Sequence, residues 1–360
     1  MSAAGSMVET RRAASGIGGG NRSAFRRALL RWYDAHGRDL PWRKTRDPYR
    51  IWLSEIMLQQ TRVAAVLEHY RIFLERFPGL DALAAASEAD VLAAWSGLGY
   101  YRRARMLRQC AQQIVEQHEG SFPRNSEDLL MLPGIGRYTA AAIASIAFGE
   151  PVAVVDGNVA RVLQRLIGSP VTTRQIWKHA QKFLARSRPG DFNQAMMELG
   201  ATICVPREPR CLACPVRKWC ATQGQGEEQH AEPSVPQQKK EIWCAIDWRE
   251  GDSNENGGGK GKVRLVQRSP KASLMASMWE LPQTSASPPG LRTAAHWRTF
   301  RHSITVTSYT VHVLRNKSSR DLTLPDIQQA AKGKWIEVDR ILQLPITGLT
   351  RKILKASGII

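Results

Sequence analysis

Long hydrophobic runs are missing from this chain. No apolar stretch approaches the roughly 20 residues that a membrane-spanning helix needs. Residues 1–22 are rich in Ala, Ser, Gly and Arg and lack the apolar core of a secretory signal, so they predict a disordered tail. These absences argue against a membrane-spanning or secreted protein, and we expect the chain to stay in a reducing compartment.

Acidic residues are scarce relative to basic ones. The chain carries 51 Lys and Arg but only 32 Asp and Glu, which gives a formal net charge of +19. Such a surface favours a polyanionic partner, and nucleic acid is the natural candidate. A generally basic, solvated surface is the alternative, but an excess this large without a long lysine tract makes that explanation the weaker one.

The hydrophobic pattern changes along the chain. From Ser23 to Cys220 apolar residues recur with helical spacing. Residues 222–240 are dominated by Gln, Glu, Gly, Pro and Ser, which predicts a linker. Beyond it, alternating residues predict strands at 242–248, 263–267 and 304–313, with a mixed segment from 335 to 342.

The chain is long enough for two or three domains with hydrophobic cores of their own. The patterns predict a mainly α region followed by an α+β domain. The expected division is a tail at 1–22, a helical domain at 23–221, a linker at 222–240 and a C-terminal domain at 241–360.

Four of the six cysteines lie in one short arginine-bearing segment. Gaps of six, two and five residues separate Cys204, Cys211, Cys214 and Cys220. Four thiolates so close together predict a metal centre, and such ligation serves both zinc and iron–sulfur centres. Residue chemistry alone leaves zinc, iron–sulfur and disulfides open. Cys110 and Cys244 lie in regular patterns and are expected to be core thiols.

A second motif, Leu132-Pro133-Gly134-Ile135-Gly136, lies between two helical patterns and predicts a helix–hairpin–helix. Gly134 and Gly136 would let the backbone approach a phosphate closely, and the amides at the start of the next helix would supply donors. Such a site grips DNA without reading its sequence. A Pro-Gly turn alone is weak evidence, since most are only turns.

Taken with the cysteines and with Val155-Asp156-Gly157-Asn158-Val159, the hairpin resembles the helix-hairpin-helix DNA glycosylase superfamily from Ser23 to Cys220. The cysteine spacing resembles the cluster loop of its endonuclease III and MutY group, which implies a structural [4Fe–4S] cluster. Members that also cut the DNA backbone carry a lysine two residues beyond the second hairpin glycine, where this chain has Tyr138. Without that amine no Schiff base forms by the usual route, so we expect a monofunctional glycosylase.

Two further stretches narrow the resemblance. Pro41-Trp42-Arg43 and the segment Ser54 to Thr61 closely resemble the adenine-binding region of MutY-type adenine DNA glycosylases. This resemblance implies base excision repair on double-stranded DNA, with release of adenine mispaired with 8-oxoguanine or guanine. We expect a monomer in the bacterial cytoplasm, associated with the nucleoid, or in the nucleus or mitochondria of a eukaryote.

By this resemblance Glu55 and Asp156 are the catalytic carboxylates. The apolar neighbours of Glu55 would raise its pKa and keep it protonated, able to donate to adenine N7. Asp156 would stay ionised, held by Asn158 and nearby amides, and would stabilise the oxocarbenium ion as in glycoside hydrolysis. Tyr138 would hydrogen-bond near the same atoms. The alternatives are a partly exposed helix residue for Glu55 and a simple turn former for Asp156.

Adenine cannot be reached inside a duplex, so the base must be flipped into a pocket. Candidates for that pocket are Trp42, Arg43 and Leu58. Side chains that would fill or wedge the gap in the stack are Gln60, Leu98 and Tyr100. For Leu98 and Tyr100, core packing is an equally good explanation.

The C-terminal segment Ser277 to Pro282 resembles a loop of the Nudix-related recognition domain of MutY enzymes, so we expect a Nudix-like domain. The glutamate cluster of Nudix hydrolases is missing, so we assign binding and no hydrolysis. In the family a hairpin loop bearing Phe-Ser-His detects 8-oxoguanine, and Phe300-Arg301-His302 corresponds to it here. An ordinary basic turn is the alternative.

Two other functions remain open at this point. One is a bifunctional glycosylase/lyase for damaged pyrimidines of the endonuclease III type, against which Tyr138 and the long C-terminal domain argue. The other is a DNA-binding protein that keeps the scaffold without catalysis, against which the two carboxylates argue.

Overall fold

The computed structural model describes residues 19–224, 238–249, 261–285, 296–304, 306–315 and 333–360. Unit 1 comprises the described residues of Met1–Tyr70, Gly79–Asp81 and Gln109–Ala231, and unit 2 those of Arg71–Pro78, Ala82–Arg108 and Glu232–Ile360. The chain thus leaves unit 1 and returns to it before it enters the β-rich region. The predicted tail and linker fall mostly outside the described residues, and the domain boundaries at 221 and 241 stay a prediction.

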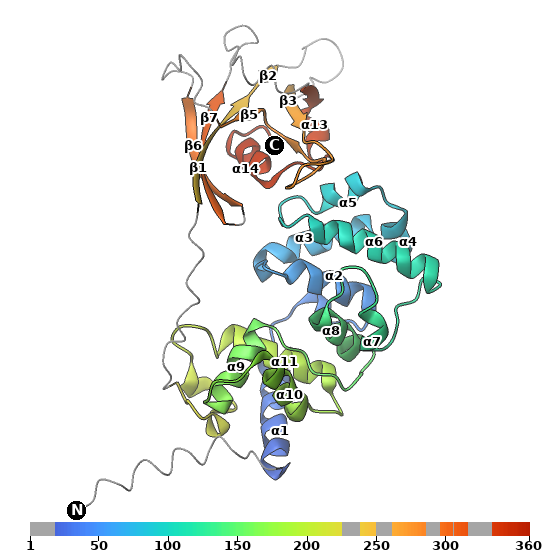
Figure 1. Cartoon of the computed structure of the whole chain (residues 1–360), viewed down its shortest axis with the longest axis vertical. Helices are drawn as coiled ribbons and strands as arrows, with labels where there is room; N and C mark the ends of the chain where they lie inside the picture. Colours follow the sequence, from blue (N-terminus) through green and yellow to red (C-terminus); the bar gives the residue numbers. More distant parts are fainter. Residues whose placement is uncertain (1–18, 225–237, 250–260, 286–295, 305, 316–332) are drawn as a thin grey trace, which may run out of the picture. The chain divides into compact units, whose positions relative to one another are not determined.

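Helices make up the regular structure of unit 1 in the part that the structure describes (Figure 1). They are α1 (Gly19–His36), the 3-10 helix η2 (Pro41–Arg43), α2 (Pro48–Leu58), α7 (Ser126–Leu129), α8 (Arg137–Ala147), α9 (Gly157–Ile167), α10 (Thr173–Phe183), α11 (Pro189–Thr202), and the 3-10 helices η3 (Cys211–Ala213) and η4 (Arg217–Trp219). Three helices contribute residues to both units, namely α3 (Val63–Arg76), α4 (Leu80–Ala85) and α6 (Arg102–Gln117).

Local sequence signals account for where several of these helices begin. Asp47 caps α2 by accepting a hydrogen bond from Tyr49 N (2.9 Å), and Pro48 occupies the first helical position, where its missing N–H costs nothing. Thr172 and Gln175 form a capping box at α10. The ends of the helices are therefore largely set by residues close in sequence.

Helix α11 crosses α8 and α9 at positions where only glycine fits. A Cβ on Gly190 would lie 2.7 Å from the carbonyl oxygen of Ser145 on α8. A Cβ on Gly200 would lie 2.7 Å from Cβ of Asn158 on α9. Contacts this short do not occur between real side chains and backbone, so the two glycines let α11 approach both helices. The core beside it is built from rings that include Phe25, Phe183 and Phe192.

Unit 2 combines the helical segment of residues 82–108, which contains α5 (Glu88–Ala94), with two small sheets. The first sheet has the order β5-β1-β7-β6, with β1 and β7 parallel and the other pairs antiparallel. In the second, β3 pairs with β2, β4 and β8. The strands are β1 (Gln238–Ile246), β2 (Trp248–Arg249), β3 (Lys262–Gln267), β4 (Trp279–Glu280), β5 (Gln283–Thr284), β6 (His296–Ile304), β7 (Thr307–Arg315) and β8 (Lys334–Glu337).

The described residues of unit 2 also include the helices α13 (Val338–Ile341) and α14 (Gly348–Ala356). Ile341, Ile353 and Leu354 from these helices pack with Val263 and Val311 from the strands in one buried core. The predicted fold class, a mainly α region followed by an α+β domain, is confirmed.

One strand prediction is wrong. The segment 304–313 was expected to be a single strand, but β6 ends at Ile304 and β7 begins at Thr307, so the chain turns inside the predicted strand. Phe300, Arg301 and His302 consequently lie within β6, paired with Val311, Thr310 and Tyr309 of β7, and not in a hairpin loop. The alternating residues of the two strands run together in sequence, and no glycine or proline marks the turn between them.

Cys110 and Cys244 are buried free thiols, as expected, and burial raises the pKa of each to about 12. Within the described ranges, no helix has both the length and the apolar character that crossing a membrane requires.

Candidate active site

Glu55 is a buried carboxyl group on α2, with 6% of the residue exposed. Helix α2 packs against α8, and Tyr138 is the second residue of α8. The Tyr138 hydroxyl donates a hydrogen bond to Oε2 of Glu55 (2.6 Å) and also lies 3.3 Å from Sδ of Met197 on α11. Two residues predicted to be catalytic, separated by more than 80 positions in sequence, are thus in direct contact.

Burial dominates the electrostatics of this pair. It raises the pKa of Glu55 to about 7, because the charged form loses its hydration; the hydrogen bond from Tyr138 and the charge of Arg43 lower that pKa, and Asp156 raises it. Burial also raises the pKa of Tyr138 well above its usual value, and both carboxylates add to that effect. Near neutral pH Glu55 therefore holds a proton for much of the time, and Tyr138 stays neutral.

Asp156 has a different environment, because it caps α9. Its Oδ1 accepts a hydrogen bond from Val159 N (2.7 Å), and its Oδ2 accepts one from Asn158 Nδ2 (3.0 Å). The positive end of the helix dipole also favours a negative charge at this position. The predicted pairing of Asp156 with Asn158 is therefore present.

Arg161, one turn along α9, fixes the amide of Asn158. Its Nη2 donates to Oδ1 of Asn158 (2.8 Å) and to the carbonyl oxygen of Gly200 (2.8 Å), while its Nε donates to the carbonyl oxygen of Cys204 (2.9 Å). Because Oδ1 of Asn158 accepts the hydrogen bond from Arg161, Nδ2 of Asn158 faces Asp156. Arg161 was not predicted to belong to the site, and its only signal in the sequence is the spacing of three residues from Asn158 on one helix.

Glu198 on α11 is a second missed residue. Its buried carboxylate accepts hydrogen bonds from Arg38 Nε (2.7 Å), Arg38 Nη2 (2.7 Å) and Arg43 Nη2 (2.7 Å). Burial alone would raise the pKa of Glu198, but the two guanidinium groups outweigh it and hold the pKa at about 2. Glu198 thereby anchors Arg43, the charge that acts on Glu55.

The residues predicted for the base pocket have unequal surroundings. Trp42 is buried and packs edge-on against Tyr70, with ring centroids 5.3 Å apart. Leu58 is half-buried at the end of α2. Arg43 lines a polar cavity of about 370 Å³ together with Gln194, which is buried on α11. Gln194 was not predicted, and neither Trp42 nor Leu58 lines this cavity.

The predicted intercalating residues also differ. Gln60 is exposed in the turn after α2 and has a φ of 56°, a left-handed conformation that costs energy for a residue with a Cβ. Leu98 and Tyr100 belong to the loop Gly97–Tyr100 of unit 2, which we call the wedge loop. Leu98 is 6% exposed, as the packing alternative predicts, whereas Tyr100 is 51% exposed.

The hairpin has the form that the sequence predicts. Gly134 has a φ of 75°, which glycine adopts without strain, and Ile135 N donates to the carbonyl oxygen of Leu132 (3.2 Å). Gly136 is the N-cap residue of α8, and nothing lies within 4 Å of a Cβ placed on it. The first amides of α8 are open to a close approach by an anion.

The four cysteines predicted to bind a metal follow α11 and are all free and half-buried. Burial raises the pKa of Cys211 and, to about 11, that of Cys214. The neighbouring thiols of Cys204 and Cys220 raise both pKa values further. In the described part of the chain, however, no three Cys, His, Asp or Glu side chains are arranged closely enough to hold a metal ion. The donor chemistry fits an iron–sulfur cluster, and the cofactor stays a prediction.

Comparison with known proteins places this geometry in a family. The model of the HhH-GPD superfamily of base excision DNA repair proteins matches residues 53–186. The adenine DNA glycosylase of Schizosaccharomyces pombe is 32% identical over 323 residues, which are 72% of this chain and 68% of that protein. The chain belongs to the MutY-type branch of the HhH-GPD superfamily.

Other members of the superfamily are similar over different lengths. The adenine DNA glycosylase of Rattus norvegicus is 41% identical over 337 residues, covering 76% of this chain. The chain spans only 64% of that rat relative and 58% of the human one. A solved structure of a thermostable thymine-DNA glycosylase has 31% identity and a TM-score of 0.54, and covers 57% of this chain and 97% of its own.

In this MutY-type chain, the residues predicted to sense the opposite base lie on β6 of unit 2. Phe300 is 8% exposed and belongs to the core, and Arg301 is exposed. His302 is half-buried, and burial followed by the charge of Lys352 lowers its pKa. A strand position for these residues replaces the predicted hairpin loop, so the family's Phe-Ser-His contact cannot be carried over unchanged.

Proposed function

We propose that this chain is a monofunctional adenine DNA glycosylase that releases adenine mispaired with 8-oxoguanine or guanine. The observation that carries the proposal is the contact between Glu55 and Tyr138. It joins a carboxyl group whose pKa burial raises to about 7 to a tyrosine at the position where a lyase would need an amine. Relatives named adenine DNA glycosylase support the choice of base.

The chemistry divides between the two carboxylates. Glu55 gives its proton to N7 of the flipped adenine, so that the bond between N9 and C1′ breaks and its electron pair leaves with the base. Asp156 stabilises the oxocarbenium ion and then bonds to C1′ for a short time. Water replaces Asp156 at C1′ and passes a proton back to Glu55, as in retaining glycoside hydrolysis.

Other residues have supporting roles in this proposal. Asn158 orients Asp156, and Tyr138 orients Glu55, since each is hydrogen-bonded to its carboxylate. The amides after Gly136 hold a phosphate of the duplex, while the wedge loop and Gln60 occupy the space left by the flipped base.

The same proposal gives the cysteines a structural role. Cys204, Cys211, Cys214 and Cys220 would hold a [4Fe–4S] cluster that folds the loop between them. Arg165 supports this site, because its Nη1 donates to Sγ of Cys204 (3.3 Å). The cluster would take no part in hydrolysis.

The test is single-turnover release of adenine from duplexes that pair it with 8-oxoguanine, guanine or thymine. Further duplexes carry thymine opposite guanine or a damaged pyrimidine. We expect fast release opposite 8-oxoguanine, slower release opposite guanine, and strand breaks only after alkali. A covalent adduct trapped by borohydride on the pyrimidine-lesion duplex would instead support an endonuclease III-type lyase. If the protein released neither adenine nor a pyrimidine from any duplex, it would be a DNA-binding protein without catalysis.

A further inference from the structure

The wedge loop is tied to the C-terminal helix of its own unit by the residue that precedes it. Ser96 is 2% exposed. Its Oγ donates a hydrogen bond to the carbonyl oxygen of Ile346 (2.7 Å) and accepts one from Nε of Arg351 (3.1 Å). Ile346 lies just before α14 and Arg351 lies on it. One buried hydroxyl therefore joins the start of the wedge loop to α14.

A second tie follows the wedge loop. Tyr101 is buried, and a Cβ on Gly348, the first residue of α14, would lie 4.0 Å from its hydroxyl oxygen. One turn further along α6, Nη2 of Arg105 donates to the carbonyl oxygen of Ala276 (2.6 Å). The wedge loop is thus attached to the C-terminal part of unit 2 on both sides.

The wedge loop is also braced internally. Nε1 of Trp95 donates to the carbonyl oxygen of Gly99 (3.1 Å), and Nη2 of Arg103 donates to those of Leu98 (3.3 Å) and Gly99 (3.2 Å). The guanidinium of Arg103 lies 5.3 Å from the Trp95 ring centroid and 5.4 Å from that of Tyr100. A displacement at Ser96 would therefore be passed on to Tyr100 and not absorbed within the loop.

Helix α14 also contacts β6, the strand that carries the residues predicted to sense the opposite base. This contact is made by Lys352, the residue after Arg351. Nζ of Lys352 donates to the carbonyl oxygen of Arg301 (2.9 Å) and lies 5.8 Å from the ring centroid of Phe300. Thr350, the residue before Arg351, accepts a hydrogen bond from Leu281 N (3.0 Å). Three consecutive residues of α14, Thr350, Arg351 and Lys352, thus contact the segment Ser277–Pro282, Ser96 at the start of the wedge loop, and β6.

We propose that α14 is a bracket that sets the position of the wedge loop relative to β6, with Arg351 and Ser96 as positioning residues for opposite-base selectivity. This inference rests on the proposed function. Because one helix holds both elements, Tyr100 can enter the stack only at a fixed offset from the base that β6 meets. Loosening the bracket should lower selectivity more than it lowers the chemical step, which occurs at residues of unit 1.

The first experiment follows hydrogen exchange of the amides of residues 96–101 in the full chain without DNA. We compare Arg351→Ala and Ser96→Ala with Lys355→Ala, which removes an exposed positive charge from the same helix. Exchange should speed up by about tenfold in the first two variants, because each loses a buried hydrogen bond, and should be unchanged in the third. Thermal melts check that each variant is folded. If Arg351→Ala does not fold, the exchange rates of Ser96→Ala alone show whether α14 holds the wedge loop.

The second experiment measures single-turnover rates with adenine opposite 8-oxoguanine and opposite guanine. The ratio of the two rates should fall by about threefold or more in Arg351→Ala and Ser96→Ala and stay constant in Lys355→Ala. Unchanged exchange would overturn the bracket, and faster exchange with an unchanged ratio would overturn its role in selectivity. If the wild-type chain releases no adenine, the proposed function fails, while the exchange result still decides whether α14 holds the wedge loop.

Discussion

The two carboxyl groups of unit 1 that are predicted to be catalytic have different surroundings. Glu55 has lost its water and has one neutral hydroxyl partner, so its proton is retained up to a pKa of about 7. Asp156 accepts two hydrogen bonds at the N-terminus of α9, which compensate its negative charge. Glu55 can therefore donate a proton near neutral pH, as the proposed cleavage of the glycosidic bond requires.

Replacement of Glu55, the proposed acid, tests its role directly. Glu55→Gln keeps the size of the side chain but has no proton to donate to N7, so we expect the single-turnover rate to fall by about 10²–10⁴. Binding to a duplex with an uncleavable adenine analogue should change little. Base release at an unaltered rate would show that Glu55 is not the acid.

The pH dependence follows from the direction of the Glu55 shift. The active form is protonated, so the rate should be constant below the pKa and should fall as the pH rises through about 7. The hydrogen bond from Tyr138 lowers the pKa of Glu55. In Tyr138→Phe the inflection should therefore move to higher pH, because the anion loses its donor. A rate profile measured on both proteins would contradict this assignment if the inflection moved to lower pH or did not move.

At the scale of elements, the site depends on how closely α11 approaches α9. Gly200→Ala would place a methyl group 2.7 Å from Cβ of Asn158 and push the start of α9 away. We expect a loss of about 1–3 kcal/mol in the free energy of unfolding, from overpacking, and a slower single-turnover rate as Asn158 and Asp156 shift.

Gly79→Ala is the matched control for this change. Gly79 has no atom within 4 Å of an added Cβ, and its backbone does not need glycine. Urea unfolding and base release of the two variants should therefore differ clearly. Equal stabilities would mean that α9 and α11 can separate without cost.

The elements show what the sequence could and could not predict. The hairpin, the helix starts at Asp47 and Thr172 and the N-cap at Asp156 are local signals, and the structure contains each of them. Glu198 could not be predicted, because its partners Arg38 and Arg43 lie 160 and 155 positions away. The turn between β6 and β7 was missed because its residues carry no turn signal and the alternation continues through it.

Tertiary contacts also decide which motif residues are available for function. Leu98 and Tyr100 come from one loop and looked equivalent in sequence, yet one is buried and the other exposed. The contact between Glu55 and Tyr138 was foreseen only through family resemblance, since nothing in either helix alone indicates the other. Motifs therefore predicted which residues carry the chemistry, and packing determined the surroundings of each of them.

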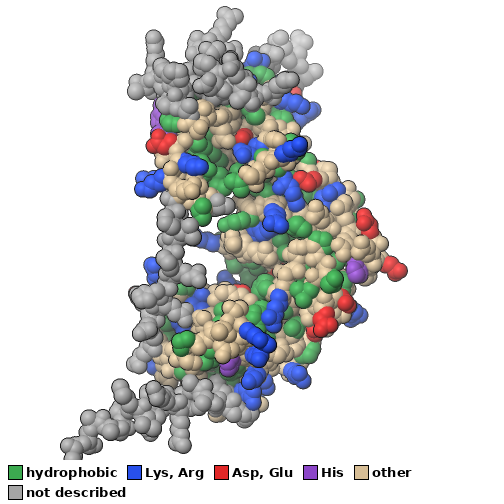
Figure 2. All heavy atoms as spheres, viewed as in Figure 1, with side chains coloured by type: hydrophobic (Ala, Val, Ile, Leu, Met, Phe, Trp, Pro, Cys, Tyr) green, Lys and Arg blue, Asp and Glu red, His purple; other side chains and the backbone are tan. Residues whose placement is uncertain are grey.

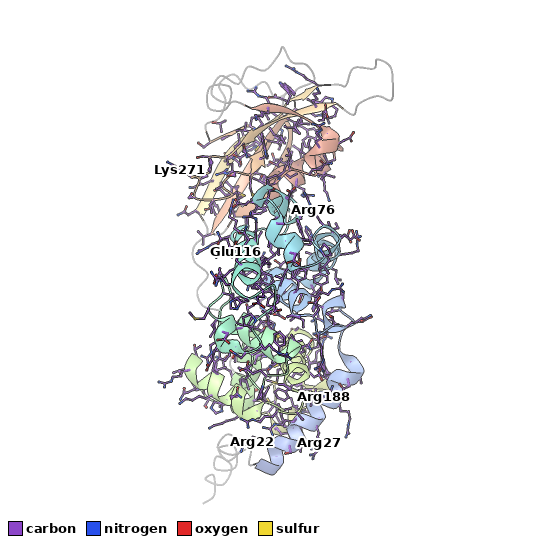
Figure 3. All side chains as sticks on the ribbon, turned by 90° about the vertical axis from the view of Figure 1, so that its right-hand side faces the viewer. Arg22, Arg27, Arg76, Glu116, Arg188 and Lys271 are labelled. Atoms are coloured by element: carbon purple, nitrogen blue, oxygen red, sulfur yellow. The ribbon has the colours of Figure 1, made fainter. Side chains whose placement is uncertain are left out.

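At the scale of the whole molecule, Lys and Arg side chains are scattered over the face of the protein that Figure 2 shows. Arg22 and Arg27 on α1 and Arg188 before α11 are examples in unit 1 (Figure 3). Some of this charge is neutralised within the protein, since Arg188 pairs with Asp34 (2.7 Å) and Asp191 (2.7 Å). Such pairs cancel equal numbers of positive and negative charges, so the net charge of +19 remains available to an external polyanion.

This excess predicts how binding depends on salt. Affinity for a mispaired duplex should fall steeply with salt concentration, by about 10³–10⁵ between 50 and 200 mM if roughly 6–10 phosphates are contacted. The single-turnover rate of the saturated complex should change little, because Glu55 is buried and its charge interactions are weakly screened. Arg217→Ala, in the exposed cysteine loop, should reduce the slope of log K against log salt by about one, and Lys355→Ala on α14 should leave it unchanged. Fluorescence anisotropy titrations at several salt concentrations give the slopes of both variants. An equal loss of slope in Arg217→Ala and Lys355→Ala would mean that the net charge alone attracts the DNA, without a defined phosphate contact at Arg217.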